Sequence, residues 1–98
     1  MTNPAILQEE PMSDETDRKL RRILSDVLAL KEGHADGFTA ETGLFGHLPE
    51  LDSMAVAGLL TELEDRLDIV IDDDELDGEL LETYGSLLAF AKRKRGDA

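Results

Sequence analysis

The chain has 98 residues, with 23 acidic and 10 basic side chains, a net charge of −13 at pH 7 and no cysteine. This length predicts one domain with a single modest core, and the lack of cysteine excludes disulfides, thiolate metal sites and a cysteine nucleophile. The acidity argues against binding to nucleic acid, and because no long apolar run is present we expect no membrane insertion. We therefore expect a soluble, cytoplasmic monomer whose partners carry basic patches.

The two ends of the chain are predicted to be tails. Residues 1–12 show little periodicity and are expected to be flexible, and residues 96–98 form a short C-terminal tail. The domain between them covers residues 13–95. Its first helix is expected to begin at a capping residue, either Ser13 or Thr16.

Apolar residues recur at helical spacing in this first helix, which we expect to end near Lys31 to Gly33. Four cations also cluster in it, and we interpret them as a solvated face with local ion-pair partners. The apolar residues are Leu20, Ile23, Leu24, Val27 and Leu28, and the cations are Arg18, Lys19, Arg21 and Arg22.

A segment with four glycines and a proline follows, which excludes a regular element. We predict a long loop whose apolar side chains Phe38, Leu44 and Phe45 anchor it to the core. The loop also holds both histidines, His34 and His47, with acids nearby. Their separation matches no helical or short-turn spacing of metal ligands, so we interpret them as exposed residues without a metal.

The second predicted helix begins at Asp52 or Ser53 and has the clearest apolar periodicity in the chain. Its apolar face is matched by an acidic face on the other side. The apolar residues are Val56, Leu59, Leu60, Leu63 and Leu67, and the acids are Glu62, Glu64, Asp65 and Asp68.

The segment after this helix is β-branched and then acidic. Residues 69–71 are interpreted as an extended connection with one or two side chains in the core, since no other strand is available to pair with it. A short helical turn is expected in the acidic run that follows, and it would bury Leu76, Leu80 or Leu81.

A last helix is predicted after Thr83, which can cap it. Residues 92–95 are all cations and lie at its C-terminal end, where they interact well with the helix dipole. The sequence therefore predicts an all-α fold, a four-helix bundle with a long first loop and a short third helix. The expected apolar face of the last helix consists of Tyr84, Leu87, Leu88 and Ala91.

One candidate site is a calcium loop in the acidic run. Asp73, Glu75 and Asp77, followed by Gly78, match positions 1, 3, 5 and 6 of an EF-hand loop. Position 12 should be a bidentate glutamate and is Tyr84. Without that ligand the cage lacks two oxygens, so we expect no specific metal site here.

The second candidate site is Ser53. Nothing placed near it in sequence would activate it as a nucleophile, and the Gly-x-Ser-x-Gly elbow of hydrolases is absent, so we expect no catalysis. A serine at the start of a helix has two other uses. It can cap the helix, or it can carry a phosphate ester whose charge lies against the positive helix end.

The surroundings of Ser53 resemble the acyl carrier protein family. The resemblance rests on Leu51-Asp52-Ser53-Met54, on the acidic helix that ends in residues 63–69, and on the isoleucine and acidic segment after it. It implies a 4′-phosphopantetheine arm on Ser53, transferred from coenzyme A by a separate magnesium-dependent phosphopantetheinyl transferase. The thiol of that arm carries acyl groups as thioesters between loading and transfer enzymes. The resemblance also makes Asp52 and Met54 recognition residues, and it assigns contacts with basic partner enzymes to Glu64, Asp65 and Asp73. We add Glu62 and Asp68, which lie with Glu64 and Asp65 on the acidic face of the second helix.

The charge distribution supports this interpretation independently. From Glu50 to Glu82 there are thirteen acids and one base, a net charge of −12. Such a field speeds the encounter with cationic partners and allows quick release, as a shuttle requires.

Several positions depart from the family pattern. Glu50 stands where glycine is frequent, and Ala57, Gly58 and Thr61 replace an acid and two apolar contacts. We therefore predict a stand-alone carrier for a specialised pathway that makes a secondary metabolite, a surface polymer or a modified lipid. A peptidyl carrier, a noncovalent acidic adaptor and a calcium-responsive module remain as alternatives.

Overall fold

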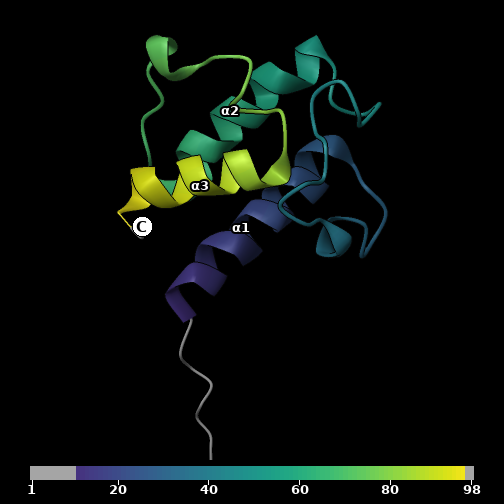
Figure 1. Cartoon of the computed structure of the whole chain (residues 1–98), viewed down its shortest axis with the longest axis horizontal. Helices are drawn as coiled ribbons and strands as arrows, with labels where there is room; N and C mark the ends of the chain where they lie inside the picture. The colour runs from purple at the N-terminus through teal and green to yellow at the C-terminus, as the bar shows by residue number, and fades with distance from the viewer. Residues whose placement is uncertain (1–10, 97–98) are drawn as a thin grey trace, which may run out of the picture.

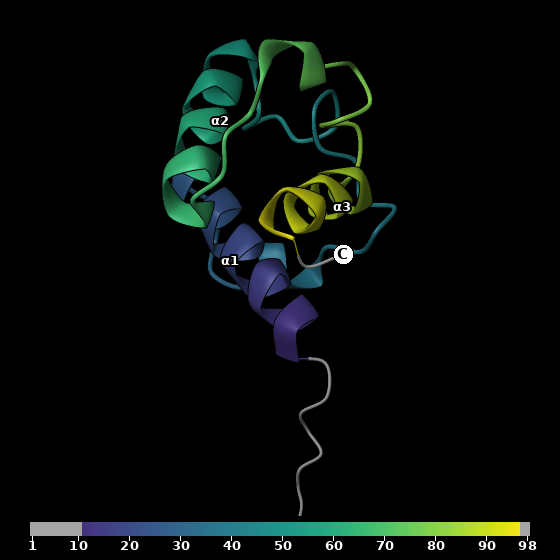
Figure 2. The same cartoon turned by 90° about the vertical axis from the view of Figure 1, so that its left-hand side faces the viewer.

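Three α-helices joined by long loops make up the described part of the chain (Figure 1). The computed structural model describes residues 11–96, with side chains from residue 15 onward. Most of the expected N-terminal tail and the last two residues of the chain lie outside this range. Helix α1 packs against both α2 and α3 (Figure 2). The elements in order are α1 (Pro11–Leu28), the 3-10 helix η2 (Ala35–Gly37), α2 (Ser53–Leu67), the 3-10 helix η3 (Asp73–Glu75) and α3 (Tyr84–Arg95).

The expected all-α fold is confirmed, but a four-helix count is not. Where a short third helix was predicted, the chain forms only the single turn η3. The Glu75 carboxylate accepts a hydrogen bond from the Asp72 N–H at 2.9 Å, which closes this turn locally. Leu80 is buried as expected, whereas Leu76 is 39% exposed, so the turn has no apolar face that would extend it into a helix.

The core is formed by the helix faces that the apolar periodicity predicted. Val27, Val56, Leu60 and Leu88 lie at its margin and are half-buried. Phe90 is a core residue that the predicted face of the last helix omitted. The buried residues of the three helices are Leu20, Ile23, Leu24, Leu28, Leu59, Leu63, Leu67, Tyr84, Leu87, Phe90 and Ala91.

Helix α1 differs from the prediction at both ends. It begins at Pro11, a residue favoured in the first helical turn, so Ser13 and Thr16 lie inside the helix and do not cap it. Thr16 is buried, and its hydroxyl accepts a hydrogen bond from Arg95 at 2.8 Å. The helix ends at Leu28 because the next residue, Ala29, adopts a left-handed conformation with φ of 54°.

The long first loop is tied to α1 by Arg21. The guanidinium donates hydrogen bonds to the carbonyls of Ala35 at 2.6 Å and Phe38 at 3.1 Å. It also pairs with Asp17 at 3.0 Å, which confirms a local ion-pair partner for part of the cationic cluster. Phe38 is buried as predicted, with its ring 5.7 Å from that of Tyr84. The loop is therefore fixed to the core along its first half.

The connection after α2 is extended, as predicted. Ile69 is buried and Ile71 is half-buried, while Val70 between them is 69% exposed.

Within residues 11–96, no helix is both long and apolar enough to cross a membrane.

Candidate functional site

The site begins where the first loop enters α2, at the upper right of Figure 1. Asp52 is the N-cap of this helix, and its carboxylate accepts a hydrogen bond from the Ala55 N–H at 2.8 Å. Ser53 is the first helical residue. The alternative in which Ser53 caps α2 is therefore wrong, because the side chain before it already satisfies that backbone donor.

The Ser53 side chain has no structural role among the described residues. It is exposed, and its hydroxyl makes no hydrogen bond within the described residues. The first N–H groups of a helix have no partner inside it, and the helix dipole adds positive potential there. A negatively charged group attached to Ser53 would therefore lie at a favourable place.

The loop before Ser53 is attached to the segment before α3. Gly43 and Thr83 form an antiparallel bridge. The N–H of Leu44 donates to the Glu82 carbonyl, and the N–H of Phe45 donates to the Leu81 carbonyl, both at 2.9 Å. These bonds fix the path of the chain shortly before the site.

The chain turns directly after this bridge, at residues 45–47. Leu44 is fully buried, whereas Phe45, the first residue of the turn, is 47% exposed. The prediction that Phe45 anchors the loop to the core is wrong for this reason.

A shallow hollow of about 600 Å³ lies between this loop and the start of α2. The sequence did not single it out, although an aromatic residue and two leucines shortly before a candidate serine were the available signal. The hollow is lined by Phe45, Gly46, His47, Leu48, Pro49, Leu51, Asp52 and Ser53.

The predicted partner-binding acids are spread along α2 and the segment after it. Asp65, Asp68 and Asp73 are exposed. Glu62 lies 3.8 Å from Arg66, and Glu64 accepts a hydrogen bond from the Ile71 N–H at 2.8 Å. Glu64 therefore holds the connection after α2 in addition to carrying charge.

Two acids of the degenerate calcium loop, Glu75 and Asp77, are used in internal contacts. Glu75 pairs with Lys94 at 3.1 Å, and the Asp77 carboxylate accepts hydrogen bonds from the N–H groups of Glu79 and Leu80. The hydrogen bond from the Asp72 N–H, together with Lys94, lowers the pKa of Glu75. Among residues whose side chains are described, no group of three potential ligands is arranged to hold a metal ion.

The two histidines of the first loop make contacts with other residues of that loop. His34 is exposed, with its ring edge-on to Phe38 at 5.5 Å. His47 is also exposed, and its ring lies over the bare backbone of Gly43, where an added Cβ would come within 2.3 Å of the imidazole.

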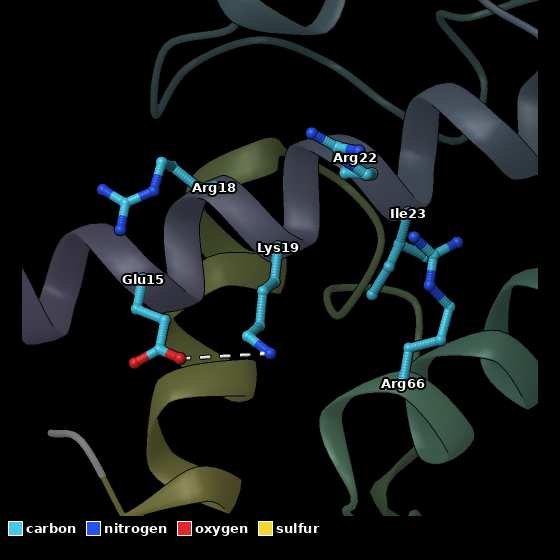
Figure 3. A pocket seen from close by; sticks show the side chains of 6 residues that line it. All are labelled: Glu15, Arg18, Lys19, Arg22, Ile23 and Arg66. Carbon is cyan, nitrogen blue, oxygen red and sulfur yellow. Dashed lines mark ion pairs between the residues drawn. The ribbon is translucent and has the colours of Figure 1, made fainter.

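The cations of α1 surround a different hollow, of about 460 Å³ (Figure 3). Lys19 and Glu15, one turn apart on α1, pair at 3.9 Å beside it, and Arg66 reaches it from α2. Arg66 lies thirteen residues after Ser53, which corresponds to about 20 Å along the helix. The cationic surface is therefore at the opposite end of α2 from the serine. It consists of Arg18, Lys19, Arg22 and Arg66, next to Glu15 and Ile23.

Comparison with known proteins identifies a relative of similar structure. No protein-family profile and no curated protein matches the chain. A holo acyl carrier protein from Nitrosomonas europaea, determined by solution NMR, matches with a TM-score of 0.74 and 41% sequence identity, over 84% of this chain and 96% of the relative. The two chains are thus similar in both fold and sequence over almost the whole length of the relative. The chain belongs to the acyl carrier protein family.

Proposed function

We propose that this protein carries acyl groups as thioesters on a 4′-phosphopantetheine arm attached to Ser53. The proposal rests on the different roles of two adjacent residues, Asp52 and Ser53. Asp52 caps α2, and the exposed hydroxyl of Ser53 has no hydrogen bond to the described residues and lies next to the positive end of the helix. The holo form of the related carrier supports the presence of the arm.

The attachment is a phosphoryl transfer from coenzyme A. A bond forms between the Ser53 Oγ and the phosphorus next to pantetheine, and the pyrophosphate bond of coenzyme A breaks. Adenosine 3′,5′-bisphosphate leaves, and the hydroxyl proton passes to a base on the transferase. Within this chain, the start of α2 presents the hydroxyl and places the ester where backbone N–H groups favour its charge. When bound, the arm supplies the thiol that forms thioesters.

The flanking residues fit a recognition role. Asp52 is exposed although it caps the helix, and Met54 is 85% exposed. An apolar side chain so open to water, next to the modified residue, can dock against an enzyme that must reach the serine. We assign Asp52 and Met54 to contact with the transferase and with acyl-handling enzymes.

The acids around α2 supply long-range attraction to basic docking surfaces. We assign partner contacts to the exposed Asp65, Asp68 and Asp73 and to Glu62, and we give Glu64 a second, structural role. Because the charges from Glu50 to Glu82 sum to −12, binding to such enzymes should weaken steeply with added salt.

We further propose that the carrier serves a specialised pathway that makes a surface polymer, a secondary metabolite or a modified lipid. The proposal rests on Glu50, Ala57, Gly58 and Thr61, which depart from the common docking surface of the family. The test is to supply the acylated protein to a standard fatty-acid elongation system. Processing as efficient as that of the system's own carrier would overturn this assignment.

The attachment is tested by intact mass. The protein is incubated with coenzyme A, magnesium and a broad-specificity phosphopantetheinyl transferase, beside Ser53→Ala. Ser25→Ala is the matched control, because it removes a half-buried hydroxyl on α1 that is not part of the hollow at Ser53. We expect one phosphopantetheine on the parent and the control and none on Ser53→Ala. No gain with several transferases would contradict the proposal and favour a noncovalent adaptor that acts through the acidic surface.

A further inference from the structure

We propose that the phosphopantetheine arm lies along the hollow before Ser53 and is held there by Phe45 and His47. This inference rests on the proposed attachment to Ser53. It names the surface that the arm contacts and two residues that hold it. The hollow is formed by residues 45–53, and Ser53 itself is part of its wall, so an arm on that serine starts inside it.

The backbone that carries Phe45 is held by several hydrogen bonds. Phe45 and Leu44 are hydrogen-bonded to the segment before α3, and the Leu44 carbonyl accepts further bonds from the N–H groups of His47 at 2.9 Å and Leu48 at 2.8 Å. The ring of Phe45 is therefore half-exposed on an ordered, hydrogen-bonded turn, and local fraying of the chain is not the cause of its exposure. Covering an exposed apolar side chain removes its surface from water, which lowers the free energy.

The position of His47 is also set by the backbone. Its ring packs over Gly43, where any side chain would collide with it. The imidazole can donate and accept hydrogen bonds at the rim of the hollow. Apolar and polar groups thus lie close together, since Leu48 and Leu51 complete the wall with Phe45.

This mixture suits the arm itself. Pantetheine carries a pair of methyl groups near its phosphate end and two amides further along. The methyl groups can cover the Phe45 ring, and the imidazole of His47 can pair with an amide or a phosphate oxygen. Attachment to Ser53 makes the contact intramolecular, with an effective concentration of about millimolar for a short flexible link. Even a weak contact is then populated.

The experiment compares apo and holo protein by NMR with an isotope-labelled arm. We expect contacts between the arm's methyl groups and the Phe45 ring, and holo-dependent amide shifts across residues 45–51. Phe45→Ala should abolish the methyl contacts and reduce those shifts. Val70→Ala is the matched control, because Val70 is an exposed apolar residue outside the hollow. His47→Ala should reduce the shifts while leaving the Phe45 contacts in place.

Two other results would overturn the inference. One is a set of arm contacts with residues of α2 or of the segment after it in place of Phe45. The other is an arm with no contacts and shifts confined to the neighbours of Ser53. Intact mass recorded on each NMR sample separates this failure from that of the proposed function, since a sample without added phosphopantetheine contradicts the attachment and not the placement of the arm.

Discussion

The Tyr84 hydroxyl donates a hydrogen bond to the Asp17 carboxylate and thereby joins the start of α3 to α1. Tyr84 is 1% exposed, and the guanidinium of Arg21 lies 4.7 Å from the centre of its ring. Arg21 in turn holds the first loop. One buried contact therefore connects two helices and the loop that leads toward Ser53.

Replacing Tyr84 by phenylalanine should lower the free energy of unfolding by about 1–2 kcal/mol, because the ring stays packed while a hydrogen bond to a charged acceptor is lost. Urea denaturation followed by circular dichroism measures the change. Thr61→Ala is the control, since the Thr61 hydroxyl is exposed and bonds only within its own helix. A loss equal to that of the control would show that the Tyr84 hydroxyl contributes nothing.

The same contact predicts a pH dependence. Burial, reinforced by the hydrogen bond to Asp17, raises the pKa of Tyr84 far above its usual value. The folded state therefore favours the protonated phenol, and the unfolded state begins to lose its proton near pH 10. The contribution of the protonated phenol to the free energy of unfolding is therefore complete below about pH 10 and declines as the pH rises further. Because the chain has one tyrosine, absorbance near 295 nm reports Tyr84 alone. Phenolate formation near pH 10 while the helices remain folded would contradict the prediction.

The start of α2 predicts different effects for two neighbouring residues. Asp52→Ala should lower stability by about 1 kcal/mol through the lost cap. Ser53→Ala should change it by less than about 0.5 kcal/mol, since the exposed hydroxyl makes no bond within the described residues. Thermal and urea unfolding of both variants test this. A larger loss for Ser53→Ala would reassign the capping role to the serine.

Two glycines give a matched pair of opposite effects. Gly43→Ala places a methyl group within 2.3 Å of His47 and should destabilise the turn before Ser53. Gly58→Ala adds a methyl group to the interior of α2 with nothing within 4 Å, and should stabilise the protein by about 1 kcal/mol. Melting temperatures of the two variants should therefore move in opposite directions. A shift of the same sign in both would contradict one of the two assignments.

Repulsion among the acids predicts a salt dependence. With a net charge of −13, the folded chain concentrates like charges that the unfolded chain separates. The melting temperature should rise with added NaCl and rise more with MgCl₂, because screening weakens the repulsion. Calorimetry over a range of salt concentrations measures this. A flat response would mean that the acids are well separated or paired.

Local periodicity was enough to find the three helices and most of the core. The spacing of Leu59, Leu63 and Leu67 is decided within one helix, and so is the cap at Thr83, whose hydroxyl accepts a hydrogen bond from the Ser86 N–H at 3.1 Å. Such features depend on residues three or four positions apart, which a sequence displays directly.

The features that were missed depend on distant partners. Phe45 points outward because a bridge to the segment before α3 sets the direction of its backbone, and no local pattern shows that bridge. Arg21 looked like one of four similar cations, although its guanidinium bonds to two carbonyls of the loop. The identity of the cap on α2 was undecided between two adjacent residues that are both good caps.

The bridge between Gly43 and Thr83 also has a consequence for folding. It joins residues forty positions apart, so closing it costs more chain entropy than forming the helices, whose contacts are local. We expect it to form late, after the individual helices. The turn that presents Ser53 is then complete only in a fully folded chain. An enzyme that recognises this turn would modify finished molecules and leave incompletely folded chains unmodified.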